Sequence, residues 1–133
     1  MERWQSVSVD VNGAGVTLEV SDMGRVKRAG AVLHIYTGRG SCARADERKK
    51  YGACAYQYVK VGKNKKVRKF YVHRLVCAAF LGFSGLEVDH KNGVKTDNRL
   101  VNLRYVTHGE NMKNLKMLQR AKRERGQLFF NFA

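Results

Sequence analysis

Four polar residues in the second half of the chain have the types and order that metal-assisted hydrolysis requires. Asp89 and His90 follow a short apolar run, Asn102 comes twelve positions after His90, and Asn111 comes nine positions after Asn102. An imidazole with a pKa near ~6.5 can take a proton from water at neutral pH. Carboxylate and amide oxygens, here those of Asp89 and Asn111, suit Mg²⁺ or Mn²⁺. The set predicts a site with one divalent ion that could hydrolyse a phosphodiester.

The elements that must position these side chains can be predicted from local patterns. Residues 86–90 and 102–106 are expected to form two antiparallel strands, with a loop between them. Thr107-His108-Gly109-Glu110 is a capping box, which predicts a helix that begins at Thr107 and has Asn111 in its first turn. If this helix crosses the two strands, the side chains of His90, Asn102 and Asn111 can face one point, and Asp89 precedes His90 on the first strand.

This order of strand, loop, strand and helix, with these residues, resembles the HNH homing endonuclease family. Tyr71-Val72-His73-Arg74-Leu75-Val76 resembles the segment before the family's catalytic core, and residues 18–26 with Trp4 resemble its N-terminal module. That module match is looser, because Leu18 stands where an aromatic residue is usual and Asp22 where Asn is usual. The resemblance covers nearly the whole chain.

The resemblance implies an α+β fold, with an N-terminal antiparallel β-sheet and hairpin region followed by a ββα-metal (His-Me finger) HNH core. It implies a metal-dependent DNA endonuclease in which His90 and Asn102 are catalytic. Asn102 would support the active-site histidine and its loop, and Asp89 and Asn111 would hold one Mg²⁺ or Mn²⁺ ion. Asn98 is an alternative to Asn102, but its place within the loop favours a role in shaping that loop.

Composition points to the same partner. The 133 residues include 26 Lys and Arg against 11 Asp and Glu, a formal net charge of +15, which favours binding to a polyanion such as double-stranded DNA. Residues 48–74 contain many bases and no acid. The predicted DNA-binding residues are Lys63, Lys65, Lys66, Arg68, Lys69, Arg74, Lys91 and Arg104.

The rest of the chain predicts strands and one more helix. Strands are expected near residues 7–11 and 16–20, joined by an Asn12-Gly13 turn, and at 31–37. A loop is expected at 38–52, a hairpin from 54–61 and 66–72 around a turn at 62–65, and a helix at 73–81. The last helix is expected to run to residue 125, with Met112, Leu115 and Leu118 facing inward.

Three parts of the chain are therefore predicted. Residues 1–72 form a DNA-binding β region, 73–125 the helix and nuclease core, and 126–133 an apolar tail that packs on the core or on a second copy. Cys42, Cys54 and Cys77 are odd in number and form no C-x-x-C pair, so we expect no structural zinc. The sequence has no apolar run long enough to span a bilayer and no leader, which predicts no membrane partner and a cytoplasmic protein, in the host cell if a phage encodes it.

Several alternatives stay open at this level. A single site cuts one strand, so a monomer should nick DNA and a homodimer could cut both strands. The rival function is a non-catalytic nucleic-acid-binding protein that keeps an HNH-like fold. His73 is expected to begin a helix rather than act as a second base. His108 lies beside the site at the helix N-terminus, where the positive end of the helix dipole disfavours a charged imidazole, so a contact with DNA is the less favoured alternative for it.

Overall fold

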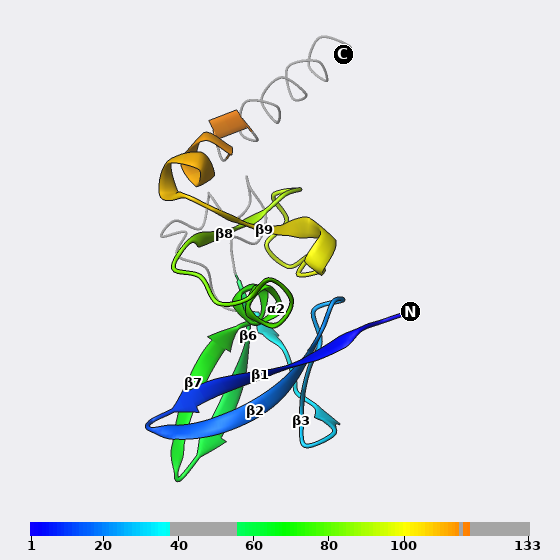
Figure 1. Cartoon of the computed structure of the whole chain (residues 1–133), viewed down its shortest axis with the longest axis vertical. Coiled ribbons are helices and arrows are strands. Elements are labelled where there is room, and N and C mark those ends of the chain that lie inside the picture. The colour runs from blue at the N-terminus through cyan, green and yellow to red at the C-terminus, as the bar shows by residue number, and fades with distance from the viewer. Residues whose placement is uncertain (38–55, 115, 118–133) are drawn as a thin grey trace, which may run out of the picture.

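Helix α2 (Val72–Leu81) lies at the centre of the fold and contacts strands of three antiparallel sheets. The structure is a computed structural model that describes residues 1–37, 56–114 and 116–117 (Figure 1). The first sheet contains β1 (Trp4–Val11), β2 (Ala14–Ser21), β3 (Val26–Arg28) and β4 (Ala31–Val32). The second contains β5 (Tyr36–Thr37), β6 (Gln57–Lys63) and β7 (Lys66–Tyr71), and the third β8 (Glu87–His90) and β9 (Leu103–Val106). This arrangement confirms the predicted α+β class.

The first hairpin forms as its sequence predicts. Asn12 and Gly13 both adopt positive φ, at 52° and 85°, and join β1 to β2 in a two-residue turn. Alternate residues of β2 are buried because one face of the sheet covers the core; these are Val16, Leu18 and Val20.

The strand predicted at residues 31–37 is wrong, because this segment contributes to two different sheets. Positive φ at Ala29 and Gly30 turns the chain so that β4 pairs with β3, a strand that the sequence reading missed. The chain then leaves the first sheet, and Tyr36 pairs with Tyr58 in the second. Turn geometry, rather than the apolar pattern, decides where this strand is divided.

The second hairpin has a tighter turn than the sequence suggests. Asn64 and Lys65 adopt φ of 52° and 63°, so Gly62 and Lys63 remain in β6 and pair with Val67 and Lys66. Alternation places Val59 and Val61 of β6 in the core.

Helix α2 holds the two halves of the molecule together. Val72, Leu75, Val76 and Cys77 are buried, and the helix ends where Gly82 adopts a φ of 85°. In Figure 1 the first two sheets lie on one side of α2, while β8 and β9 lie on the other. In the part of the chain that the structure describes, we find no helix of the length and apolarity needed to cross a bilayer.

The predicted order of strand, loop, strand and helix is present after α2. A short 3-10 helix, η1 (Leu100–Asn102), precedes β9. The capping box is confirmed at Thr107, whose hydroxyl accepts a hydrogen bond from the Glu110 amide at 3.3 Å, while the Thr107 amide donates to the Glu110 carboxylate at 3.4 Å. A helix follows at residues 108–114.

One prediction about this last helix is wrong. Met112 was expected to face inward, but it is 43% exposed and lines a cavity of about 420 Å³ instead of the core. Leu115, Leu118, the predicted helix end near residue 125, the tail 126–133, the loop 38–52, Cys42 and Cys54 lie outside the described residues.

Candidate active site

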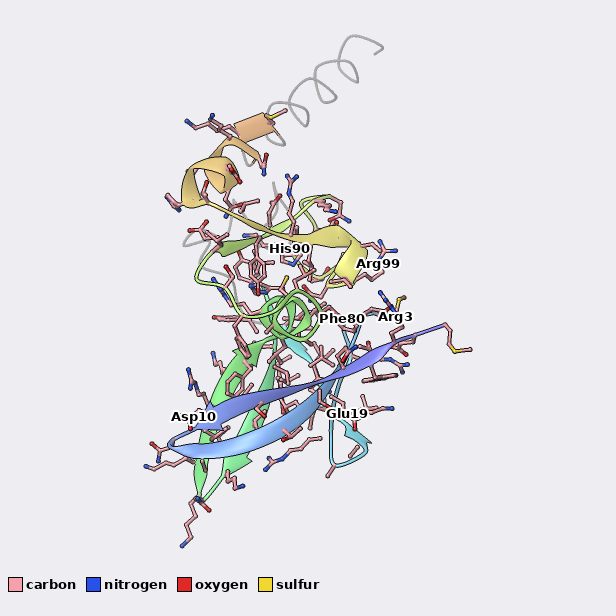
Figure 2. The ribbon with its side chains drawn as sticks, in the orientation of Figure 1. Arg3, Asp10, Glu19, Phe80, His90 and Arg99 are labelled. Atoms are coloured by element: carbon pink, nitrogen blue, oxygen red, sulfur yellow. The ribbon has the colours of Figure 1, made fainter. Side chains whose placement is uncertain are left out.

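Asp89, His90 and Asn111 line one small cavity of about 60 Å³. Asp89 and His90 come from the end of β8, and Asn111 comes from the first turn of the last helix. Lys95, from the loop between the strands, lines the same cavity. Figure 2 shows His90 at the level of β8 and β9, between α2 and the last helix. The structure therefore brings His90 and Asn111 to one cavity with Asp89, whereas Asn102, which was predicted to face the same point, does not line it.

The ring of His90 is held by Asn98. The distance from His90 Nε2 to Asn98 Oδ1 is 2.8 Å. The amide nitrogen of Asn98 donates to Gln57 Oε1 at 3.0 Å, which orients the Asn98 oxygen toward the ring. A neutral His90 in this network carries its proton on Nε2, so its Nδ1 can accept a proton. Asn98 was preferred as a residue that shapes the loop, and the structure shows in addition that its side chain contacts the histidine directly.

Two buried histidines lie against each other beneath this site. The ring centroids of His73 and His90 are 5.3 Å apart. Burial lowers the pKa of His90 below its usual value, and it lowers the pKa of His73 to about 3. Both rings are therefore neutral at pH 7, which is the form a proton-accepting histidine needs.

Asp89 has one oxygen engaged by its neighbours. Arg104, its partner across the β8–β9 ladder, donates from Nε to Asp89 Oδ2 at 2.8 Å, and Asn114 donates to the same oxygen at 3.2 Å. Among the described residues both hydrogen bonds end on Oδ2, which leaves Oδ1 as the oxygen for an added ligand. The positive charge of Arg104 thus compensates the negative charge of the buried Asp89 carboxylate when no metal ion is bound.

Asn111 is fixed by a residue that the sequence analysis did not single out. Its Nδ2 donates to Glu87 Oε2 at 2.7 Å, so its amide oxygen is the atom left for a ligand. The second carboxylate oxygen of Glu87 lies 2.7 Å from His108 Nδ1. The hydrogen bond from Asn111, followed by that of His108, lowers the pKa of Glu87, which is ionised at neutral pH.

Asn102 holds the loop that closes the site rather than the histidine ring. Its side-chain oxygen accepts from the Asn92 amide at 3.0 Å, and its nitrogen donates to the Asp97 carbonyl at 2.8 Å. The backbone carbonyl of Asn102 also accepts from the Lys91 amide. Arg99 lowers the pKa of Asp97 to about 2, so this loop keeps an ionised carboxylate beside its turn.

The donor set fits a small hard cation. Asp89 offers a charged oxygen and Asn111 a neutral one at the same cavity, which is the chemistry that Mg²⁺ and Mn²⁺ accept when phosphate and water complete their coordination. Within residues 1–37, 56–114 and 116–117, we find no group of three or more His, Cys, Asp or Glu side chains suited to a metal. Any ion at this cavity would depend on oxygen atoms from its substrate.

The predicted DNA-binding side chains are all exposed but do not form one cluster. Lys63, Lys65, Lys66, Arg68 and Lys69 lie on the β6–β7 hairpin, which extends away from β8 and β9 on the other side of α2 (Figure 1). Arg68 and Lys63 donate to backbone carbonyls of the first hairpin, at 2.9 and 3.3 Å.

The other predicted contacts lie nearer the cavity. Arg74 donates to the Leu86 carbonyl at 3.3 Å, and Arg104 is engaged by Asp89. Lys91 is exposed at the end of β8. Lys95 is the lysine that lines the cavity itself. The sequence analysis missed it, because its position in an irregular loop carries no periodic signal.

Comparison with known proteins places these observations in a family context. Residues 70–113 match the family model described as HNH endonuclease. DNA endonuclease I-HmuI of Bacillus phage SP01 is 44% identical over 61 residues, which are 44% of this chain and 35% of that protein. The match thus spans about a third of that relative's length.

The fold is similar to a solved structure of the same relative. The structure described as DNA binding and cleavage by the HNH homing endonuclease I-HmuI has a TM-score of 0.59 and 29% sequence identity to this chain. The similarity covers 94% of this chain and 68% of that one. It therefore extends beyond the segment matched by the family model, into the sheets that precede α2.

Proposed function

We propose that this chain, which contains an HNH endonuclease domain at residues 70–113, is a DNA endonuclease that hydrolyses phosphodiester bonds. One observation carries the proposal: a neutral imidazole, a carboxylate and an amide oxygen line the same cavity of about 60 Å³. The similarity to I-HmuI, described as an HNH homing endonuclease that binds and cleaves DNA, supports the same chemistry.

His90 is the proposed general base. Burial keeps its ring neutral, and Asn98 keeps the proton on Nε2, so Nδ1 can take a proton from an attacking water. Asn102 contributes by fixing the loop that carries Asn98, through its bonds to Asn92 and Asp97. The ammonium group of Lys95 at the cavity can bind a phosphate oxygen.

Asp89 and Asn111 are the proposed ligands of one divalent ion, Mg²⁺ or Mn²⁺. Such an ion, when bound, neutralises charge at the phosphorus and stabilises the leaving oxygen. The residues keep their two oxygens at the cavity by separate contacts, Asp89 through Arg104 and Asn111 through Glu87. Because only one of these ligands is charged, we expect metal binding to strengthen when DNA supplies phosphate oxygens.

The proposed substrate is double-stranded DNA. The net charge of +15 and the exposed bases of the β6–β7 hairpin support contacts to the phosphate backbone, with Arg74, Lys91 and Arg104 nearer the cleaved bond. In this proposal residues 1–72 bind DNA and residues 73–125 cut it.

The number of candidate active sites per chain sets the expected products. One site handles one phosphodiester, so a monomer is expected to nick DNA, and a homodimer would be needed to cut both strands together. The proposal places the activity in the cytoplasm, in that of the host cell if the gene belongs to a phage, since DNA is accessible there.

A nicking assay with supercoiled plasmid tests the proposal. The wild-type chain should convert the plasmid to the open circular form with Mg²⁺ or Mn²⁺, and EDTA should stop the reaction. His90→Ala should lower the rate at least ~100-fold while DNA binding, measured by gel shift, is retained, because a positioned base contributes about that factor or more. His34→Ala removes an exposed histidine and serves as the matched control.

The rival function gives a different result. A wild-type chain that binds DNA but cuts it with neither metal would contradict the proposal and support a non-catalytic binder. If His90→Ala still cuts DNA at the wild-type rate, the general-base role of His90 is contradicted, but the proposed endonuclease activity is not.

A further inference from the structure

We propose that Glu87 is a positioning residue, whose carboxylate holds the Asn111 side chain with its amide oxygen toward the cavity. This inference rests on the proposed function, because it concerns the ligand set of the same site. Its basis is the 2.7 Å hydrogen bond from Asn111 Nδ2 to Glu87 Oε2.

Asn111 lies between two cavities, and its hydrogen bond to Glu87 assigns its amide nitrogen to one of them. Asn111 lines both the cavity of about 60 Å³ and a neighbouring one of about 420 Å³, which Glu87 also lines. The Asn111 nitrogen donates its hydrogen bond to Glu87, on the side of the larger cavity. Because the oxygen and nitrogen of a planar amide point in different directions, a nitrogen held by Glu87 leaves the oxygen facing away from Glu87, and the cavity on which Asn111 borders without Glu87 is the one lined by Asp89 and His90.

An ionised carboxylate is suited to this task because it only accepts hydrogen bonds. If the Asn111 nitrogen faces this carboxylate, the amide donates a hydrogen bond to it. If the Asn111 oxygen faces it instead, the two oxygens repel each other. A glutamine at this position could accept from the nitrogen or donate to the oxygen, so it would permit both orientations of Asn111. The charge of Glu87, rather than its size, therefore selects the orientation that a cation needs.

Element geometry explains how one side chain reaches its partners. Glu87 and Asp89 are two residues apart on β8 and point to the same face of the strand. His108 and Asn111 are three residues apart and lie on one face of the last helix, and both bond to Glu87. Glu87 thus fastens the first turn of this helix to the strand that carries Asp89.

The test compares Glu87→Gln with the wild type by Mn²⁺ binding and by nicking. Free Mn²⁺ is measured by electron paramagnetic resonance in the presence of a DNA duplex, and the Asn111 side-chain amide is followed by ¹⁵N NMR. We expect the Mn²⁺ concentration for half-saturation to rise about 10-fold, in binding and in nicking, because partners that orient metal ligands typically contribute this much. The Asn111 amide resonance should move as its hydrogen bond changes.

A double-variant comparison separates positioning from a simple loss of charge near the ion. In an Asn111→Ala background, Glu87→Gln should have no further effect on Mn²⁺ binding if Glu87 acts through Asn111. An equal loss in both backgrounds would overturn the inference. Glu19→Gln, at an exposed acid on β2, gives the matched control for the same substitution away from the site.

The results distinguish this inference from the proposed function. If the wild type does not cut DNA but Mn²⁺ binding and the Asn111 resonance respond to Glu87→Gln as expected, the proposed activity fails and the positioning role stands. If the wild type cuts and Glu87→Gln matches it in Mn²⁺ dependence, the positioning role fails alone. A wild-type chain that binds no Mn²⁺ with DNA present overturns both.

Discussion

His73 and His90 are two buried rings whose charge states follow from the same cause. Desolvation is the largest influence that lowers the pKa of each, and it acts most strongly on His73, whose pKa falls to about 3. The Nδ1 atom of His73 is buried without a hydrogen-bond partner among the described residues, so the packing around it offers no support for a positive charge. The ring of His73 is therefore neutral at neutral pH and places no positive charge beside His90.

Stability should depend on pH through His73. The unfolded chain binds a proton there with a pKa near ~6.5, but the folded chain does so only near pH 3, so stability present above pH 6.5 is lost as the pH falls. Lowering the pH from about 7.5 to about 5.5 should reduce the free energy of unfolding by about 1.4 kcal/mol through this residue, with a further loss from His90. Urea unfolding at the two pH values measures the difference.

The control is His73→Gln, which removes the titrating group but keeps a polar side chain. Between about pH 7.5 and about pH 5.5, its free energy of unfolding should fall by about 1.4 kcal/mol less than that of the wild type. A pH dependence equal to that of the wild type would show that His73 is not the source.

At the scale of elements, turns decide where the strands of the second sheet begin and end. The β6–β7 turn places both Asn64 and Lys65 at positive φ. Asn tolerates this region because its short polar side chain can bond locally, whereas Lys65 has no such compensation. Asn-Gly is the preferred residue pair for a two-residue turn of this type, and replacing Lys65 with glycine would give the hairpin that pair.

Lys65→Gly should therefore stabilise the fold by about 0.5–1 kcal/mol, since glycine removes the steric cost of positive φ but adds entropy to the unfolded chain. Thermal unfolding followed by circular dichroism measures the effect. Lys66→Gly, at the adjacent position in β7, removes the same charge and should destabilise the hairpin instead. A lower stability for Lys65→Gly would contradict the assigned turn.

At the scale of the whole molecule, α2 is the element through which the parts are coupled. It packs against β1 and β2, against β6 and β7, and against β8 and β9, and its Leu75 is 5% exposed. The site elements and the N-terminal sheet therefore share one core. A loss of packing on α2 should weaken both together.

Leu75→Ala should lower the free energy of unfolding by about 2–5 kcal/mol, as expected for a buried leucine that leaves a cavity. Fluorescence of Trp4 reports β1, and amide exchange of Val106 reports β9; both should change in a single transition. Phe83→Ala truncates an apolar side chain that is 77% exposed and should have an effect within about 0.5 kcal/mol. Loss of β9 protection ahead of the Trp4 transition would contradict a shared core.

Local patterns in the sequence determined much of this protein. Alternation predicted β1 and β2, the apolar stripe predicted α2, and the capping box predicted the helix start at Thr107, because each signal arises among residues a few positions apart. Residue chemistry, together with the resemblance to HNH nucleases, named Asp89, His90 and Asn111, which line one cavity. Their roles remain proposals.

Only the tertiary structure decided which side chains support that site. Glu87 meets Asn111 across 24 residues, and Gln57 meets Asn98 across 41. Such contacts depend on how β6, β8 and the last helix pack around α2, and no periodic signal records the distance between separate elements. For the same reason Asn102 was preferred to Asn98 as the partner of His90, and the segment 31–37 was predicted as one strand although two sheets divide it.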